Sequence, residues 1–286
     1  MANFGGQTLL KGPFLDRNWM GQNPDYESAD IVMLGLPFDG TVSYRPGSRF
    51  APEQIRLASW GLEEYSPNFD KHLSDVNFHD AGDLELPLGN TYKSLDVIEQ
   101  NVEEIYHDGK KVFGIGGEHL VTLPEIKAVS KFYKDLAIVH FDAHTDLREE
   151  YLGEEMSHSA VIRHASKIVG AQNLKQIGIR SGMKEEFNFM REHHTLAKTY
   201  SDLDSLKDKK IFVTVDLDVL DPSIMPGTGT PESGGLNFNT LIGWFTYLKD
   251  FDIIGADVVE LAPDYDASGV STAVASKVIR ELLMIL

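Results

Sequence analysis

The sequence predicts an α/β fold in which helices cover both faces of a parallel sheet. Short apolar runs rich in Val, Ile and Phe alternate along the chain with longer segments of helical periodicity, a pattern typical of parallel sheets. The chain has 286 residues, of which 42% are hydrophobic and 24% charged. This composition is globular, and the length supports a large core without disulfides. We expect one domain over residues 1–286, with residues 1–28 as an N-terminal extension.

Seven apolar runs are predicted as strands because they are rich in β-branched and aromatic residues and end in Gly, Pro or Asp. In chain order they cover residues 30–36, 76–81, 112–116, 137–142, 174–179, 211–218 and 253–261. Seven segments are predicted as helices, and Pro52 and Pro124 stand in first turns, where proline is tolerated. The helices cover residues 52–60, 95–107, 123–133, 159–169, 184–194, 239–248 and 271–286.

The chain is strongly acidic and contains no cysteine. Lys and Arg total 26 against 44 Asp and Glu, a net charge of −18, which argues against nucleic acid or an anionic membrane as partner. The lack of cysteine excludes disulfides, thiolate metal sites and cysteine nucleophiles. The longest mainly apolar run covers residues 31–38, far short of the roughly 20 residues of a membrane span. Residues 1–20 show no secretory pattern, so we expect a cytoplasmic protein.

Ligands of such folds bind outside the carboxyl ends of the strands, and polar residues gather at four predicted strand ends. The first is Gly116-Gly117-Glu118-His119, where the glycines permit close backbone approach. His119 is a candidate metal ligand. On this motif alone, a capping or core histidine is the alternative.

The second strand end carries Asp142, His144 and Asp146. At positions i, i+2 and i+4 of extended backbone, these side chains project to one side. Two carboxylates bracketing an imidazole after an apolar strand are costly without a cation. The motif therefore favours metal binding over its alternative, a turn capped by aspartates.

The third strand end carries Asp216 and Asp218, which are expected to share one side of a strand. Like charges at this spacing repel unless a proton or a metal lies between them. The following segment, residues 226–235, is rich in Gly and Thr but lacks the Gly-Lys-Ser/Thr of a phosphate loop, so we interpret it as a rigid pocket wall. The fourth strand end carries Glu260, a lone carboxylate that could also be a helix-cap acceptor.

The first three motifs together supply enough ligands for two cations. They are His119, Asp142, His144, Asp146, Asp216 and Asp218. Oxygen-rich ligation with imidazole and no sulfur suits a hard six-coordinate ion, with Mn²⁺ first and Mg²⁺, Fe²⁺, Co²⁺ or Zn²⁺ behind it. Two adjacent ions can lower the pKa of a shared water and produce a nucleophile near neutral pH.

These motifs resemble the ureohydrolases, the family of arginase, agmatinase, guanidinobutyrase and formimidoylglutamase, with agmatinase the nearest branch. Residues 44–56, which begin Tyr-Arg-Pro-Gly-Ser-Arg-Phe, resemble the N-terminal segment of that family. The resemblance implies a three-layer αβα fold around a mainly parallel eight-stranded sheet, two Mn²⁺ ions per chain and a homo-oligomer, either hexamer or trimer. Glu118 stands where the family more often has Asp; we do not expect it to bind metal, and the departure concerns only the support of His119.

The resemblance also implies how the ligands are shared. One ion would be held by His119, Asp142, Asp146 and Asp216, and the other by Asp142, His144, Asp216 and Asp218, with Asp142 and Asp216 bridging.

A guanidinium substrate needs an anchor and a proton for its leaving amine. The resemblance places a substrate-binding glutamate at Glu260, whose carboxylate can pair with the planar cation. His158 is the candidate proton shuttle, since histidine titrates near physiological pH. The alternative for His158 is a surface histidine at a helix start. His140, within the strand before Asp142, is expected to pack or hydrogen-bond inside the sheet.

The members of this family differ in the group that their substrate carries at the end opposite the guanidinium, here called its tail. Residues 147–157 contain four glutamates and Arg148 and are expected to line the mouth of the site, which favours a cationic tail; a merely solvated acidic loop is the alternative. We therefore expect hydrolysis of agmatine to putrescine and urea. Arg148 could instead bind a carboxylate tail, so guanidinobutyrase, arginase and formimidoylglutamase activities stay open. Other classes are a binuclear phosphoesterase and a non-catalytic metal-binding protein.

Overall fold

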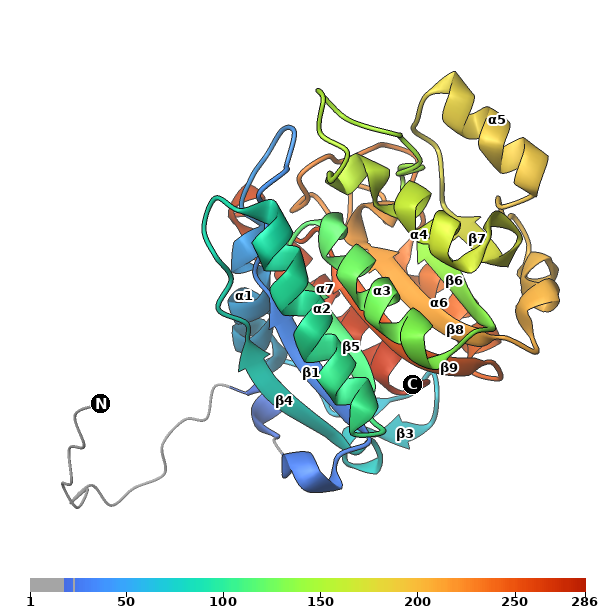
Figure 1. The fold of residues 1–286 in the computed structure, drawn as a ribbon. Coiled ribbons are helices and arrows are strands. Elements are labelled where there is room, and N and C mark those ends of the chain that lie inside the picture. Colours follow the sequence, from blue (N-terminus) through green and yellow to red (C-terminus); the bar gives the residue numbers. More distant parts are fainter. Residues whose placement is uncertain (1–17, 23) are drawn as a thin grey trace, which may run out of the picture.

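Seven parallel strands form the central sheet in the computed structural model, which describes residues 18–22 and 24–286. Across the sheet their order is β4-β1-β5-β9-β8-β6-β7, and each neighbouring pair is parallel (Figure 1). The strands are β1 (Ile31–Leu36), β4 (Phe78–Asp83), β5 (Lys111–Gly116), β6 (Leu136–Phe141), β7 (Leu174–Ile177), β8 (Lys210–Asp216) and β9 (Asp252–Val259). The predicted α/β class with a parallel sheet is confirmed.

The predicted strand count of eight is wrong for the described part of the chain, whose central sheet has seven strands. Beside the edge strand β7, a single parallel bridge pairs Gln176 with Leu196, and the 3-10 helix Tyr200–Leu206 begins four residues later. This segment makes too few ladder hydrogen bonds to form a strand. Two further strands, β2 (Tyr65–Ser66) and β3 (Lys71–His72), pair antiparallel with each other outside the sheet.

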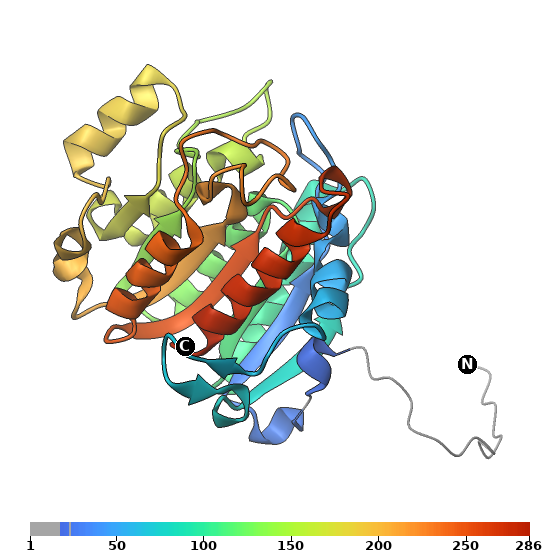
Figure 2. The same cartoon turned by 180° about the vertical axis from the view of Figure 1, so that it is seen from behind.

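Helices cover both faces of the sheet and complete three layers. The helices α2 (Thr91–His107), α3 (Thr122–Phe132) and α4 (Val161–Val169) lie on one face (Figure 1), and α1 (Ala51–Ser59), α6 (Phe238–Leu248) and α7 (Val270–Leu283) lie on the other (Figure 2). The remaining helix, α5 (Lys184–His193), lies near the edge strand β7. No helix in the described residues is long and apolar enough to cross a membrane.

Two hydrophobic cores lie between the layers, one on each face of the sheet. Alternate residues of β1 divide between them: Ile31 and Met33 belong to the core under α1, α6 and α7, and Val32 and Leu34 to the core under α2, α3 and α4. A strand buried on both faces needs apolar residues at every position. This requirement explains why the strands appear in the sequence as continuous apolar runs.

Residues 1–17 and 23 lie outside the described residues, so the expected N-terminal extension is described only from residue 18 onward. Trp19 is fully buried and packs edge-to-face on Phe78, with 5.7 Å between the ring centroids. Its backbone amide donates to Asp80 Oδ2 at 2.8 Å. Part of the expected extension therefore belongs to the folded core.

Candidate metal centre and substrate pocket

The candidate ligands follow strands that lie next to one another in the middle of the sheet. The strands β5, β9, β8 and β6 are consecutive, and they end at Gly116, Val259, Asp216 and Phe141. Because all are parallel, the segments after them meet at one edge. This arrangement places His119, Glu260, Asp216 and Asp142 together although the sequence separates them widely.

The turn after β5 depends on glycine. A Cβ at Gly117 would lie 1.9 Å from the carbonyl oxygen of Phe38, and the amide of Gly117 donates to the carbonyl of Leu36 at 2.8 Å. Only a residue without a side chain lets the two backbones approach this closely. The close approach brings His119 over the end of the sheet.

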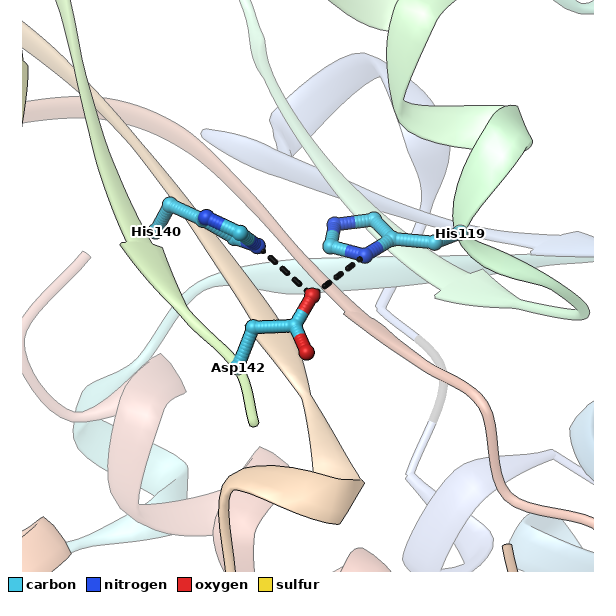
Figure 3. Close-up of side chains that lie close together, drawn as sticks. All are labelled: His119, His140 and Asp142. Atoms are coloured by element: carbon cyan, nitrogen blue, oxygen red, sulfur yellow. Dashed lines mark hydrogen bonds and ion pairs between the residues drawn. The ribbon is translucent and has the colours of Figure 1, made fainter. Parts of the chain in front are cut away.

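The imidazole of His119 faces three carboxylates. Its Nδ1 lies 3.2 Å from Asp142 Oδ2, 3.2 Å from Asp146 Oδ2 and 3.5 Å from Asp216 Oδ2. Figure 3 shows His119 and Asp142 pointing toward each other. This Nδ1 is buried and makes no satisfactory hydrogen bond with the described chain. A nitrogen and three carboxylate oxygens converging on one point are a suitable donor set for a divalent cation.

A second set of donors surrounds His144. Its Nδ1 lies 3.5 Å from Asp142 Oδ1 and 3.0 Å from Asp218 Oδ2, and the three residues form a group of metal-ligand geometry. Asp142 therefore presents Oδ2 to His119 and Oδ1 to His144. One carboxylate facing both imidazoles is the arrangement expected of a bridging ligand.

The backbone that arranges these aspartates differs from the expected extended strands. The strand β8 ends at Asp216 and continues as the 3-10 turn Leu217–Val219, with the amide of Asp218 donating to Asp216 Oδ1 at 2.8 Å. After β6, Asp146 has a φ of 50°, so Asp142, His144 and Asp146 do not lie on one extended segment. The prediction that these side chains share a strand face is wrong, because tight turns bring them together.

The electrostatics of the cluster favour a bound cation. Burial alone would lower the pKa of His119, but the carboxylates of Asp142, Asp146 and Asp216 outweigh it and raise this pKa well above its usual value. Burial and the nearby charges of Asp218 and Asp142 raise the pKa of Asp216 well above the ordinary range. Buried like charges thus disfavour ionisation until a positive charge arrives. The donor set fits metal ions.

His140 hydrogen-bonds inside the sheet, as predicted. Its Nε2 lies 2.8 Å from Asp142 Oδ2 (Figure 3). The Nε2 amide of Gln176 donates to the carbonyl of Thr145 at 2.9 Å and lies 3.2 Å from His140 Nδ1. Because this amide donates, His140 Nδ1 accepts, and His140 Nε2–H donates to Asp142. His140 thereby orients the shared carboxylate.

Glu260 follows β9 with a φ of 68°, an uncommon conformation for a non-glycine residue. The amide of His119 donates to its Oε1 at 2.8 Å, and its side chain lines the pocket beside Asp216. Burial, the charge of Glu118 and other nearby carboxylates raise the pKa of Glu260 well above its usual range. A cation beside this carboxylate would stabilise its ionised form.

His158 begins the 3-10 helix His158–Ala160 and lines the same pocket. Its backbone amide donates to Thr41 Oγ1 at 3.0 Å, and its Nε2 lies 3.3 Å from Ser43 Oγ. Burial lowers its pKa below the usual value of 6.5. The structure therefore disfavours the alternative of a surface histidine.

Glu118, which departs from the family pattern beside His119, holds a neighbouring loop in place. It is fully buried and accepts from the amide of Thr41 at 2.9 Å and from the hydroxyl of Thr41. It thus fastens the loop that carries Thr41 and Ser43 against His158. Burial raises the pKa of Glu118 to about 7, against the lowering effect of the Thr41 hydrogen bonds.

The pocket has a volume of about 280 Å³. Of residues 147–157, Arg148 and Tyr151 line it, and the Arg148 guanidinium stacks over the Tyr151 ring at 5.0 Å. The segment thus contributes to the pocket wall as expected, but through these two residues and not through its four glutamates. Glu149, for example, pairs with Arg163 and with Lys167, because these cations on α4 lie beside it.

Sequence analysis missed several residues of the pocket. Glu186 on α5 lines it, and so do Ser43 and Thr230. The Glu186 carboxylate accepts from the amide of Met183 at the start of α5. In the sequence, a glutamate at this position indicates only an ordinary helix cap. Its place in the pocket depends on how α5 lies against the strand ends, and no local motif marks it.

Residues 29–285 match the arginase family. The chain belongs to the arginase family. It is 49% identical to an agmatinase from Bacillus subtilis (strain 168), over 93% of this chain and 95% of that protein. A solved structure from Clostridium difficile, described as a candidate agmatinase, has a TM-score of 0.88 and 47% identity and covers 91% of this chain and 98% of that one. The proclavaminate amidino hydrolase of Streptomyces clavuligerus has a TM-score of 0.85 and 29% identity, with 94% and 96% covered. This arginase-family chain is a ureohydrolase enzyme, as its sequence motifs predict.

Proposed function

We propose that this arginase-family enzyme hydrolyses agmatine to putrescine and urea with two Mn²⁺ ions per chain. The observation that carries the proposal is the 49% identity with an agmatinase over nearly the whole length of both proteins. The pocket chemistry supports it. Agmatine carries a guanidinium at one end and an ammonium at the other, and the carboxylates of Glu260 and Glu186 line the same pocket.

Two histidines and four aspartates would hold the ions. His119, Asp142, Asp146 and Asp216 would bind one, and Asp142, His144, Asp216 and Asp218 the other. Their oxygen-rich donor set without sulfur suits Mn²⁺. When bound, the ions supply Lewis-acid chemistry that activates water near neutral pH.

Glu260 would bind the guanidinium of the substrate. Its Oε1 is held by the amide of His119, so the carboxylate is positioned before the substrate arrives. A guanidinium forms paired, charge-assisted hydrogen bonds with a carboxylate. This pairing would orient the guanidinium carbon toward the metal ligands.

His158 would carry the proton that the leaving amine requires. Its lowered pKa keeps the imidazole neutral near pH 7, so it can accept a proton from water and then donate it to the amine nitrogen. Thr41 and Ser43 orient the ring. Water adds to the guanidinium carbon, the carbon–nitrogen bond to the chain breaks, and the products are urea and putrescine.

The test is urea release by the manganese-reconstituted enzyme, with agmatine, arginine, guanidinobutyrate and guanidinopropionate compared and a chelated sample as control. Formiminoglutamate is scored by formamide. Chelator-sensitive urea from agmatine above the others is expected. Preference for a carboxylate tail would replace agmatine by an acidic substrate and assign its recognition to Arg148, which lines the pocket. No turnover despite two bound ions would contradict the proposal.

We also propose that the enzyme is a cytoplasmic homo-oligomer, either hexamer or trimer. Two leucines support an interface because they are almost fully exposed, Leu88 at 88% and Leu152 at 89%. Sedimentation equilibrium of the manganese-loaded enzyme measures the assembly, and a monomer across the micromolar range would contradict it.

A further inference from the structure

A buried hydrogen-bond chain runs from His119 away from the pocket into the protein. The His119 Nε2 lies 3.0 Å from Thr214 Oγ1, which lies 3.4 Å from Thr122 Oγ1. The Thr122 hydroxyl donates to Asp257 Oδ2 at 2.6 Å. All four side chains are buried at 1% exposure or less.

The chain ends at two paired carboxyl groups. Glu125 and Asp257 are both fully buried, and side-chain atoms of both lie within 3.0 Å of one point, the place that a Cβ on Gly114 would take. No N–H or O–H of the described residues donates to either oxygen of Glu125 or to Asp257 Oδ1. A Cβ at Gly114 would lie 2.7 Å from Glu125 Oε1, so the glycine leaves the space that Glu125 occupies.

Two buried carboxyls in contact cannot both be ionised without a cation. One shared proton gives a partner to two of the three atoms that otherwise have none: one Glu125 oxygen, as O–H, donates to Asp257 Oδ1. Burial and the charge of Asp257 raise the pKa of Glu125 well above its usual value, which agrees with this assignment. The other oxygen of Asp257, Oδ2, accepts from the Thr122 hydroxyl.

This acceptor sets the direction of every hydrogen bond from Asp257 back to His119. Because the Thr122 hydroxyl donates to Asp257, its oxygen accepts from Thr214. The Thr214 hydroxyl proton is then used, so its oxygen accepts from His119 Nε2–H. Nδ1 of His119, which faces three carboxylates, is left as the nitrogen with a lone pair for a cation.

We propose that Thr214, Thr122 and the proton-sharing pair of Asp257 and Glu125 are positioning residues that hold the tautomer and the ring orientation of His119 for metal binding. This inference rests on the proposed metal role of His119. Hydrogen-bond partners behind a ligating histidine raise metal affinity about 10–100-fold.

The first experiment measures Mn²⁺ affinity by chelator competition, with no activity assay. Thr214→Val keeps the shape but removes the hydroxyl, and we expect a loss of about 10–100-fold. Thr214→Ser restores the hydroxyl and should return the affinity to near that of the wild type. Thr246→Val is the matched control, because the Thr246 hydroxyl bonds to the carbonyl of Ile242 within α6. Thermal melting of the metal-free proteins identifies variants that do not fold.

The second experiment tests the shared proton in the metal-free protein. Glu125→Gln replaces the acid O–H by an amide N–H, so Asp257 keeps its donor and Mn²⁺ affinity should stay near that of the wild type. The infrared difference spectrum, wild type minus Glu125→Gln, should contain the stretch of one buried carboxylic acid. Asp257→Asn replaces the terminal carboxyl group by an amide and should weaken Mn²⁺ binding.

The outcomes separate this inference from the proposed function. Wild-type Mn²⁺ affinity in a folded Thr214→Val variant would overturn the positioning role while leaving agmatine hydrolysis intact. An unchanged carboxylic acid band in Glu125→Gln would overturn the shared proton. If Thr214→Val does not fold, Thr122→Val tests the same series of hydrogen bonds at the next hydroxyl from His119. A wild-type protein that binds no Mn²⁺ would contradict the proposed function itself.

Discussion

The backbone amide of His119 donates a hydrogen bond to Glu260 Oε1 at 2.8 Å, although 141 positions separate the two residues in sequence. The bond joins the turn after β5 to the turn after β9. A candidate metal ligand and the candidate guanidinium anchor are therefore held as one unit. Substitutions that keep an acceptor oxygen at position 260 separate the charge of this side chain from its structural role.

Glu260→Gln should abolish most substrate binding while leaving the metal site in place. The amide oxygen can still accept from His119, but the charge that pairs with guanidinium is gone. Breaking a buried hydrogen-bonded charge pair costs about 2–5 kcal/mol, so we expect kcat/KM for agmatine to fall at least about 30-fold. Steady-state kinetics and metal analysis of the same sample measure both effects. Unchanged kinetics would refute the anchor.

His158→Ala should lower kcat by about 10²–10⁴-fold, the usual contribution of a positioned acid–base group. Manganese content should not change, since His158 is not among the proposed ligands. Gln172→Ala, an exposed substitution before β7, is a control for handling and should leave kcat unaltered. Retention of full kcat by His158→Ala would rule out the shuttle.

The pH profile of kcat/KM provides a separate test of His158. Burial lowers its pKa below 6.5, and the neutral imidazole is the form that accepts a proton. Activity should therefore be complete above that pKa and be lost as the pH falls through it. The acidic limb should disappear in His158→Ala, measured on manganese-saturated enzyme. An identical limb in the variant would assign it to another group.

Asp142→Asn should lower manganese occupancy as well as rate, because Asp142 faces both His119 and His144. Inductively coupled plasma analysis after gel filtration counts the ions per chain. Asp208→Asn, at an exposed position, is the matched control and should keep the wild-type metal content. Wild-type occupancy in Asp142→Asn would contradict the shared-ligand assignment.

Glu118→Gln should change how the stability of the metal-free protein depends on pH. The folded-state pKa of Glu118 is raised from 4.5 to about 7, so its stabilising effect is complete below about pH 4.5 and is lost as the pH rises through 7. A pKa shift of this size corresponds to a change of about 3 kcal/mol in the free energy of unfolding. Urea unfolding between pH 5 and 8 should show a shallower loss of stability in Glu118→Gln. Parallel curves for the two proteins would contradict the raised pKa.

Much of the fold could be predicted because local patterns of apolar residues indicate its strands and helices. The residues of β1 that alternate between the two cores are all apolar, so a doubly covered strand was visible in the sequence. The predicted eighth strand came from family resemblance, and in this chain it is reduced to the bridge of Gln176 with Leu196. Sequence periodicity cannot reveal how many ladder bonds a short segment will find.

The sequence by itself determined the class of fold, the family and which acidic and imidazole side chains are available for a metal centre, because these depend on periodicity and on residue types at short spacing. Only the tertiary structure decided how they meet. The turns at Asp146 and Asp216, the place of Glu186 in the pocket, and the chain from His119 through Thr214 to Asp257 join residues of different elements. Such contacts are set by the order of strands in the sheet, which brings distant segments together and has no local signature.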